Sequence, residues 1–156
     1  MHPDRFAYSA ENCSIQRTLE IVGEKWTLLV LREAFYGVRR FADFHRALGC
    51  ARNLLSARLK TLVDEGILCQ QPYQQPGSRT RVEYRLTDKG QELFPALVAL
   101  MQWGDRWTAD PDGPPVMLRH QDCGHQVHAE LRCDAGHRPL SARQTQATPG
   151  GGAKAA

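Results

Sequence analysis

Apolar residues recur along the first half of the chain at spacings typical of amphipathic helices. Ile15, Leu19 and Val22 predict a short helix that ends near Gly23. The next segment, residues 24–35 (EKWTLLVLREAF), is apolar on so much of its surface that the helix it predicts must be central to the fold.

Two further amphipathic patterns follow and are separated by Gly49. Phe41, Phe44 and Leu48 fall on one side of a helix in RRFADFHRAL. In CARNLLSARLKTL, three leucines share a second apolar stripe: Leu55, Leu59 and Leu62. Two short helices joined by a tight glycine-containing turn are typical of a helix-turn-helix motif.

After Gly66 the pattern changes from helical spacing to alternation. Residues 67–73 (ILCQQPY) and 80–86 (TRVEYRL) predict two strands, and the QQPGS between them carries residues typical of a hairpin turn. A hairpin that follows a helix-turn-helix forms a wing.

The last helical pattern begins at Thr87, a residue suited to an N-cap. An apolar side runs along it as Leu93, Leu97, Leu100, Gly104 and Trp107, and Pro95 within it predicts a bend or break. This stripe is too long to be covered by one small winged domain, and Gly104 permits close approach of a second backbone, so we expect it to form a dimer interface. Packing of Trp103 and Trp107 within the monomer is the alternative.

The remaining sequence divides by composition. Residues 1–12 are expected to be a flexible lead, 13–109 the winged domain, and 110–115 (DPDGPP) a linker. Residues 116–143 predict a β-hairpin appendage, and the tail 144–156 has so few apolar residues that we expect it to be disordered. The fold class is therefore α+β, mainly α: a winged helix-turn-helix with a long C-terminal dimerisation helix and a small C-terminal β-hairpin.

Composition narrows the class of protein. Of 156 residues, 42% are hydrophobic and 24% charged, which is ordinary for a globular protein, and no apolar run approaches the roughly 20 residues of a membrane span. The opening residues MHPDRFAYSAENC contain no apolar signal core, so we expect a cytoplasmic location without membrane association.

Positive charge is concentrated rather than abundant. The net charge is only +3, yet residues 38–60 contain one acid, Asp43, and six bases: Arg39, Arg40, Arg46, Arg52, Arg58 and Lys60. A recognition helix needs an apolar stripe for seating, outward donors for base edges, and nearby cations for phosphates. The helix of residues 50–62 offers all three.

Each polar position on this surface has an expected role. Arg52 can reach guanine and Asn53 can pair with adenine in a major groove, while Ser56 and Lys60 suit bases or backbone. Arg39 and Arg40 are placed for phosphates, and Arg79 and Arg81 at the wing for a minor groove or the sugar-phosphate chain. Taken singly, each residue is more typical of an ordinary surface charge, whereas the order of helix-turn-helix, charged outer flank and basic hairpin favours DNA binding.

Five motifs together resemble the HxlR-type winged-helix transcription regulators, relatives of the MarR group. The resemblance is carried by GEKWTLLVLRE, VRRFADFHRAL, LLSARLKTLVDEGIL, RVEYRLTDKG and LFPALVALMQWGDRW, and it extends from about Cys13 to Trp107. It implies a homodimer on double-stranded DNA with a palindromic operator, with the fourth helix in the major groove. The chain departs from the family pattern at Gly49-Cys50-Ala51, where a Gly-Ile-Ser step is common and its serine would cap the helix.

The resemblance also implies an interface and a sensor. N-terminal and C-terminal helices form the dimer interface, which here corresponds to Ile15, Leu19, Leu97, Leu100, Gly104 and Trp107. Cys13 stands where family members carry a cysteine that in some of them senses oxidants or electrophiles. Cys50 is a candidate resolving thiol across the dimer; the alternative is that Cys13 and Cys50 are small semi-buried apolar residues. Five cysteines at irregular spacings argue against a disulfide framework.

The appendage contains a candidate metal set. DCGH at 122–125 and DAGH at 134–137 supply the chemistry of a zinc site: Cys123, His125, Cys133 and His137. Their spacings are not those of standard zinc knuckles, so the alternative is a hairpin that keeps fragments of a ribbon. No cofactor is required by the rest of the sequence.

These observations predict a sequence-specific DNA-binding transcriptional regulator, a homodimeric repressor whose DNA binding responds to a redox signal, an electrophile or a small-molecule effector. The chain has no phosphate-binding glycine loop, no nucleophile elbow and no carboxylate pair, so we expect no enzyme activity. A winged-helix protein-interaction module that does not bind DNA is the first alternative, and a small Cys/His metal-dependent enzyme is the second.

Overall fold

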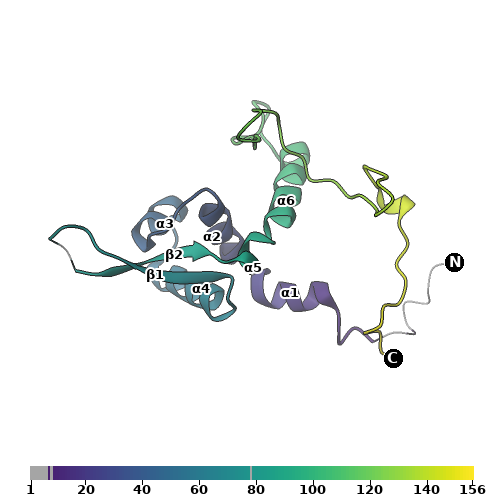
Figure 1. The fold of residues 1–156 in the computed structure, drawn as a ribbon, viewed down its shortest axis with the longest axis horizontal. Helices are drawn as coiled ribbons and strands as arrows, with labels where there is room; N and C mark the ends of the chain where they lie inside the picture. Colours follow the sequence, from purple (N-terminus) through teal and green to yellow (C-terminus); the bar gives the residue numbers. More distant parts are fainter. Residues whose placement is uncertain (1–6, 8, 78) are drawn as a thin grey trace. The chain divides into compact units, whose positions relative to one another are not determined.

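The helices predicted from the apolar spacing are all present in the computed structural model, which describes residues 7, 9–77 and 79–156. Helices α1 (Ser14–Val22), α2 (Lys25–Phe35), α3 (Phe41–Leu48) and α4 (Arg52–Asp64) precede a hairpin of β1 (Leu68–Tyr73) and β2 (Arg81–Leu86). Helices α5 (Asp88–Gln91) and α6 (Phe94–Trp107) follow, and a short 3-10 helix, η2 (Ala142–Gln144), lies near the C-terminus (Figure 1).

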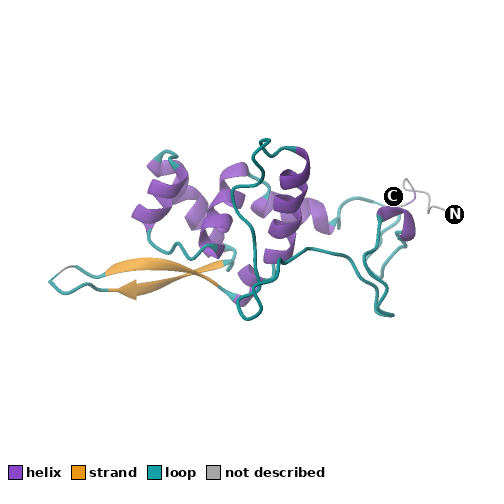
Figure 2. Cartoon of the chain, turned by 90° about the horizontal axis from the view of Figure 1, so that it is seen from above, coloured by secondary structure: helices purple, strands orange, loops and turns teal. Residues whose placement is uncertain are grey.

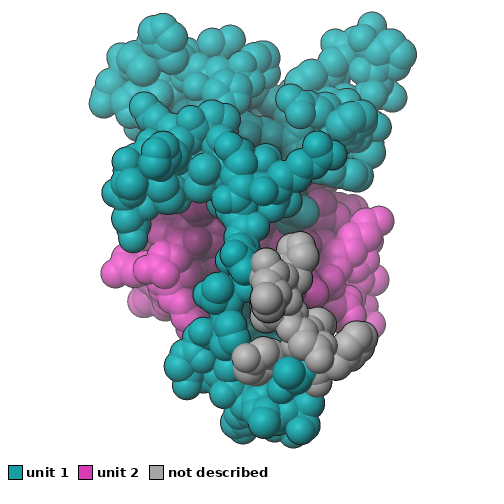
Figure 3. All heavy atoms as spheres, turned by 90° about the vertical axis from the view of Figure 1, so that its right-hand side faces the viewer, with its two compact units in different colours: residues 1–14, 98–156 teal, residues 15–97 magenta. Residues whose placement is uncertain are grey.

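The chain divides into two compact units, shown in different colours in Figure 3. One unit comprises residues 15–97 and the other residues 1–14 with 98–156. The division falls within α6, whereas the composition predicted boundaries near residues 12 and 110.

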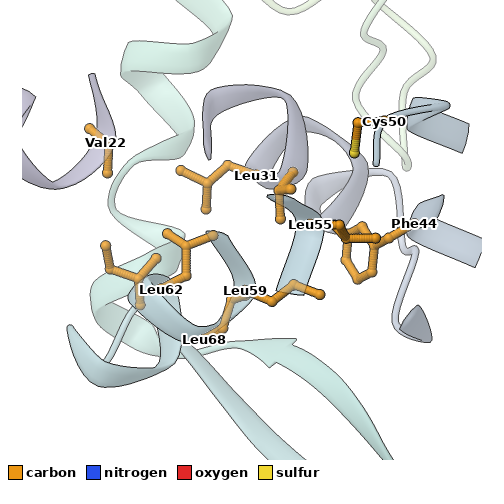
Figure 4. Close-up of a cluster of buried hydrophobic side chains, with 10 residues drawn as sticks. Val22, Leu31, Phe44, Cys50, Leu55, Leu59, Leu62 and Leu68 are labelled. Atoms are coloured by element: carbon orange, nitrogen blue, oxygen red, sulfur yellow. The ribbon is translucent and has the colours of Figure 1, made fainter. Parts of the chain in front are cut away.

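The core of the 15–97 unit is built on the leucine stripe of α4. Leu55, Leu59 and Leu62 are almost completely buried, and they pack with Leu31 from α2 and Phe44 from α3. Figure 4 shows these side chains pointing toward one another. Each such burial contributes about 1.5–3 kcal/mol, so this stripe fixes the orientation of α4.

Two glycines set how the elements join. Gly49 ends α3 with φ +64°, a left-handed conformation that side chains with a Cβ adopt at a cost, and it makes the turn into α4. At Gly90 of α5, a Cβ would lie 2.3 Å from the carbonyl oxygen of Ile67, so only glycine allows α5 to pack so closely against the start of β1.

The wing has the predicted strands. β1 and β2 are antiparallel, with Leu68 opposite Leu86 and Tyr73 opposite Arg81. In both ribbon views the turn end of this hairpin extends beyond the helices of its own unit (Figure 2). Ser78 of the predicted turn lies outside the described residues.

The expected break in the last helix is confirmed. α5 ends at Gln91 and α6 begins at Phe94, so Pro95 occupies the first turn of α6, where no backbone N–H is needed. Thr87 is the predicted N-cap: its Oγ1 accepts a hydrogen bond from the Gly90 N–H at 3.1 Å.

The C-terminal appendage differs from the predicted hairpin. Residues 116–143, all of which are described, contain one antiparallel bridge, Arg119 with Gln126, and no regular strand. Beyond that bridge the backbone pairs with a side chain instead of a strand: the Gln102 amide donates to the Val127 carbonyl at 2.7 Å and accepts from the Ala129 N–H at 2.9 Å. Two short segments without a covering layer form only marginal strands.

The tail, which composition predicts to be disordered, makes hydrogen bonds with the segment before α1. The Ser9 N–H donates to the Lys154 carbonyl, the Ala156 N–H to the Ala7 carbonyl, and the Asn12 side-chain amide to the Gly152 carbonyl. Composition could not predict this pairing because it is made mostly by backbone groups. Residues 1–6 and 8 of the predicted flexible lead lie outside the described residues.

Candidate nucleic-acid interface

The outward side of α4 carries the four residues predicted to contact bases. The leucine stripe is buried, and the four residues beside it are exposed: Arg52, Asn53, Ser56 and Lys60. The helix begins at Arg52 although its N-cap, Ala51, makes no side-chain hydrogen bond. The missing serine therefore leaves the start of α4 where the leucine pattern predicts it.

Arg52 is held by an aromatic ring rather than by an acid. Its Cζ lies 5.1 Å from the centroid of the Phe41 ring, and in the described part of the chain no ion pair involves its guanidinium. Stacking on a ring leaves the N–H groups at the edge of the guanidinium available to an acceptor such as guanine. Lys60 differs, since its Nζ pairs with Asp64 one turn later at 2.5 Å.

Arg58 belongs to the basic cluster in sequence but not to this surface. Its side chain is 26% exposed, and Nη2 pairs with Glu24, the N-cap of α2, at 3.2 Å. The hydrophobic pattern alone could not predict this, because Arg58 lies at the edge of the leucine stripe.

The loop before α3 is joined to the wing through the backbone. The Tyr84 N–H of β2 donates to the Arg39 carbonyl at 2.7 Å, and the Arg40 Cζ lies 4.5 Å from the ring centroid of Tyr73 in β1. Arg39 is exposed and Arg40 half-buried. Phe41, Tyr73 and Tyr84 are thus positioning residues that sequence reasoning missed, since an aromatic residue in a half-buried pattern is typical of core packing.

The wing contributes two exposed arginines. Arg79 and Arg81 are exposed at the turn end of the hairpin, as predicted. Arg85, farther along β2, pairs instead with Glu83 through Nη2 at 2.5 Å. The structure therefore places Arg39, Arg40, Arg52 and the wing arginines on one unit, that of residues 15–97.

Large apolar side chains are exposed on α1, in one unit, and on the part of α6 that belongs to the other unit. Ile15 is 72% exposed and Trp107 is 68% exposed, and Leu19, Leu100 and Trp103 are also more than half exposed. Leu97 and Gly104 of the predicted interface are half-buried. The alternative in which Trp103 and Trp107 pack within the monomer core is wrong.

All five cysteines are free thiols with different surroundings. Cys13, just before α1, is half-buried, whereas Cys50 is only 6% exposed and belongs to the hydrophobic core. Cys50 thus fits the alternative of a small apolar core residue, and its burial does not support the predicted role as resolving thiol.

The predicted zinc ligands are not assembled. The Cys133 Sγ lies 3.2 Å from His137 Nδ1 across a turn closed by Gly136, but Cys123 and His125 are exposed on a separate turn. In the described part of the chain, no three histidine, cysteine or acidic side chains gather as a metal site would require. The reason is local: each Cys/His pair comes from its own tight turn.

Together, a tri-helical core, an exposed polar α4 and an arginine-bearing hairpin define a winged helix-turn-helix protein. Residues 21–112 match the HxlR-like helix-turn-helix family, and the chain belongs to that family.

Relatives agree with this assignment. An uncharacterized HTH-type transcriptional regulator of Mycobacterium tuberculosis, Rv3095, is 48% identical over 93% of this chain and 90% of its own length. The crystal structure of PA1607, assigned to transcription factors, has a TM-score of 0.79 and 40% identity and covers 88% of this chain and 95% of its own. The redox regulator HypR in its reduced form has a TM-score of 0.54 and 29% identity and covers 59% of this chain and 90% of its own.

These comparisons confirm the predicted family, the fold class and the assignment to transcription regulation. In the part of the chain that the structure describes, no helix has the length and apolar character needed to cross a membrane.

Proposed function

We infer that the protein is a homodimeric transcriptional repressor that reads a palindromic operator with α4. The observation that carries this proposal is on α4, where four exposed polar residues flank a buried leucine stripe: Arg52, Asn53, Ser56 and Lys60. A two-fold dimer places two such helices about 34 Å apart, one turn of DNA, with the wings over flanking backbone.

The dimer is supported by the exposed apolar residues of α1 and α6. Ile15 and Leu19 in one unit, and Leu100 and Trp107 in the other, are exposed apolar side chains that a second copy would cover, and aromatic residues are frequent hot spots of such interfaces. Regulation of transcription also requires DNA access, so we place the protein in the cytoplasm.

The DNA proposal is tested by fluorescence anisotropy with a labelled duplex from the upstream region of the protein's own gene. Arg52→Ala and Lys60→Ala should weaken binding about tenfold while the dimer persists. Arg143→Ala is the matched control, because Arg143 is an exposed arginine on η2, which belongs to the other unit of the chain. Unchanged binding in both α4 variants would reject the reading helix.

Salt dependence separates this function from a protein-interaction module. If several phosphates are contacted, affinity should fall by about 10³ or more between 50 and 200 mM salt. Salt-independent binding would favour the interaction module. Repression is tested with a reporter fused to the same upstream region, whose expression should rise when the gene is deleted.

A redox response is the finer part of the proposal. Its support is the half-buried Cys13 thiol before α1 and the similarity to HypR, which is named as a redox regulator and has been solved in reduced and oxidized forms. An oxidant should change the DNA affinity of the wild type but not of Cys13→Ser. Cys123→Ser is the control, and Cys50→Ser should respond like the wild type because Cys50 is buried in the core. A persistent response in Cys13→Ser would exclude Cys13 as the sensor.

A further inference from the structure

Two arginines of the 15–97 unit lie over aromatic rings that belong to different elements. The Arg40 Cζ lies 4.5 Å from the ring centroid of Tyr73, the last residue of β1. The Arg52 Cζ lies 5.1 Å from the ring centroid of Phe41, the first residue of α3. In the part of the chain that the structure describes, neither guanidinium forms an ion pair. A ring, rather than a carboxylate, therefore decides where each guanidinium lies.

The Phe41 ring is a fixed support for Arg52. It is half-buried and packs against the hydrophobic core to which Leu55 and Leu59 of α4 belong. An arginine side chain in solvent has many rotamers, and ordering it when a ligand binds costs free energy. Because the ring is anchored in the core, it restricts the exposed Arg52 guanidinium before DNA arrives.

The contacts form a continuous line from the wing to the recognition helix. Tyr73 of the wing contacts Arg40, which is the N-cap of α3. The next residue, Phe41, contacts Arg52 at the first position of α4. The two arginines therefore have different neighbours: Arg40 joins α3 to the wing, whereas Arg52 lies at the start of the helix that is expected to enter the major groove.

We propose that Phe41 determines guanine specificity by holding the Arg52 guanidinium ready to donate to O6 and N7 of a guanine. Tyr73 holds Arg40 for the phosphate backbone, which carries no sequence information. In this assignment Phe41 is a positioning residue, because it acts through Arg52. The inference rests on the proposed DNA-binding function and adds to it the residue that sets the base preference.

Fluorescence anisotropy with two duplexes tests this role. One is the duplex from the upstream region of the protein's own gene, and in the other every guanine is replaced by 7-deazaguanine, which lacks the N7 acceptor. Wild type should bind the natural duplex at least about fivefold more tightly. Arg52→Ala and Phe41→Leu should lower this ratio to less than about twofold. Phe41→Tyr keeps the ring and should keep the ratio.

Tyr73→Leu is the matched control, because it removes another half-buried ring that lies beneath an arginine. It should weaken binding to both duplexes by the same factor and leave their ratio as in the wild type. An unchanged ratio in Phe41→Leu would overturn the proposal. So would equal losses of the ratio in Phe41→Leu and Tyr73→Leu, or a Phe41→Tyr variant that behaves like Phe41→Leu.

NMR of the free protein separates this inference from DNA binding itself. Loss of the ring current in Phe41→Leu should shift the Arg52 Hδ signals and leave those of Arg40 in place, and Tyr73→Leu should do the reverse. Arg52 signals that ignore the loss of the Phe41 ring would overturn the positioning. If wild type binds neither duplex, the proposed function fails and the specificity role fails with it. Binding with an unchanged ratio in Phe41→Leu rejects the specificity role alone.

Discussion

Helices α4 and α6 carry similar apolar stripes, but the stripe of α4 is buried and the stripe of α6 is exposed. Leu55, Leu59 and Leu62 of α4 are at most 1% exposed, whereas Leu100 and Trp107 of α6 are 57% and 68% exposed. The apolar stripe of α4 is therefore buried within its own chain, and its exposed polar side is available to contact another molecule. In α6 the apolar side itself remains, so the two helices are suited to two different kinds of partner.

The largest effect on stability should come from the buried leucine stripe of α4. Leu59→Ala removes a fully buried side chain and should lower the free energy of unfolding by about 2–5 kcal/mol through lost burial and a residual cavity. Urea denaturation at a protein concentration where the monomer dominates measures this. Leu100→Ala is the matched control and should change it by less than about 0.5 kcal/mol. Equal losses in the two variants would remove the distinction between the stripes.

The exposed apolar stripe of α6 should affect the stability of the proposed dimer. Trp107→Ala should weaken the proposed dimer by about 2 kcal/mol, close to 30-fold in dissociation constant, since a large aromatic contact is lost. Sedimentation equilibrium measures the constant, with the neighbouring exposed Arg106→Ala as control. A dimer that persists unchanged in Trp107→Ala would place the interface elsewhere.

The hydroxyl of Thr87 connects α5 to Gly66, in the turn that follows α4. Thr87 Oγ1 accepts from the Gly90 N–H and donates to the Gly66 carbonyl at 2.6 Å. Thr87→Ala should cost about 1–2 kcal/mol of unfolding free energy, measured by thermal or urea denaturation. Thr87→Ser keeps the hydroxyl and should recover most of the loss; a serine variant as unstable as the alanine variant would contradict the capping role.

The smallest expected effect concerns the basic residue of α4 that faces protein rather than solvent. Arg58→Ala removes the pair with Glu24 and should cost about 1 kcal/mol or less, because Glu24 is largely exposed. The slope of DNA affinity against salt should stay the same as in the wild type, whereas Lys60→Ala should reduce it. A smaller dependence of DNA affinity on salt in Arg58→Ala would show that Arg58 contacts DNA.

How far the sequence predicts this molecule depends on the range of the interactions. Helix α4, the break before Pro95 and the cap at Thr87 follow from periodicity and from local backbone chemistry, so they were predictable. The outward positions of Asn53 and Lys60 followed from their places relative to Leu55 and Leu59. The rings beneath Arg40 and Arg52 did not, because they come from contacts whose geometry no spacing rule contains.

The errors lie where side chains and backbone pair over long separations. The side-chain amide of Gln102 makes the hydrogen bonds to Val127 and Ala129 that a neighbouring strand would make. Residues 150–156 pair with the segment before α1. The sequence left Cys50 open between a resolving thiol and a small apolar residue, and its burial in the hydrophobic core fits the second. The zinc set stays a prediction, and its two Cys/His pairs lie on separate turns.

The hydrogen bond from the Tyr84 N–H to the Arg39 carbonyl has an evolutionary consequence. Main-chain atoms alone make it, so any residue at position 39, and any except proline at position 84, can keep the alignment between the hairpin and the loop that precedes α3. Side chains on either element can then be exchanged for others with new base preferences while the frame that presents them keeps its shape. Specificity in such a frame can change one residue at a time.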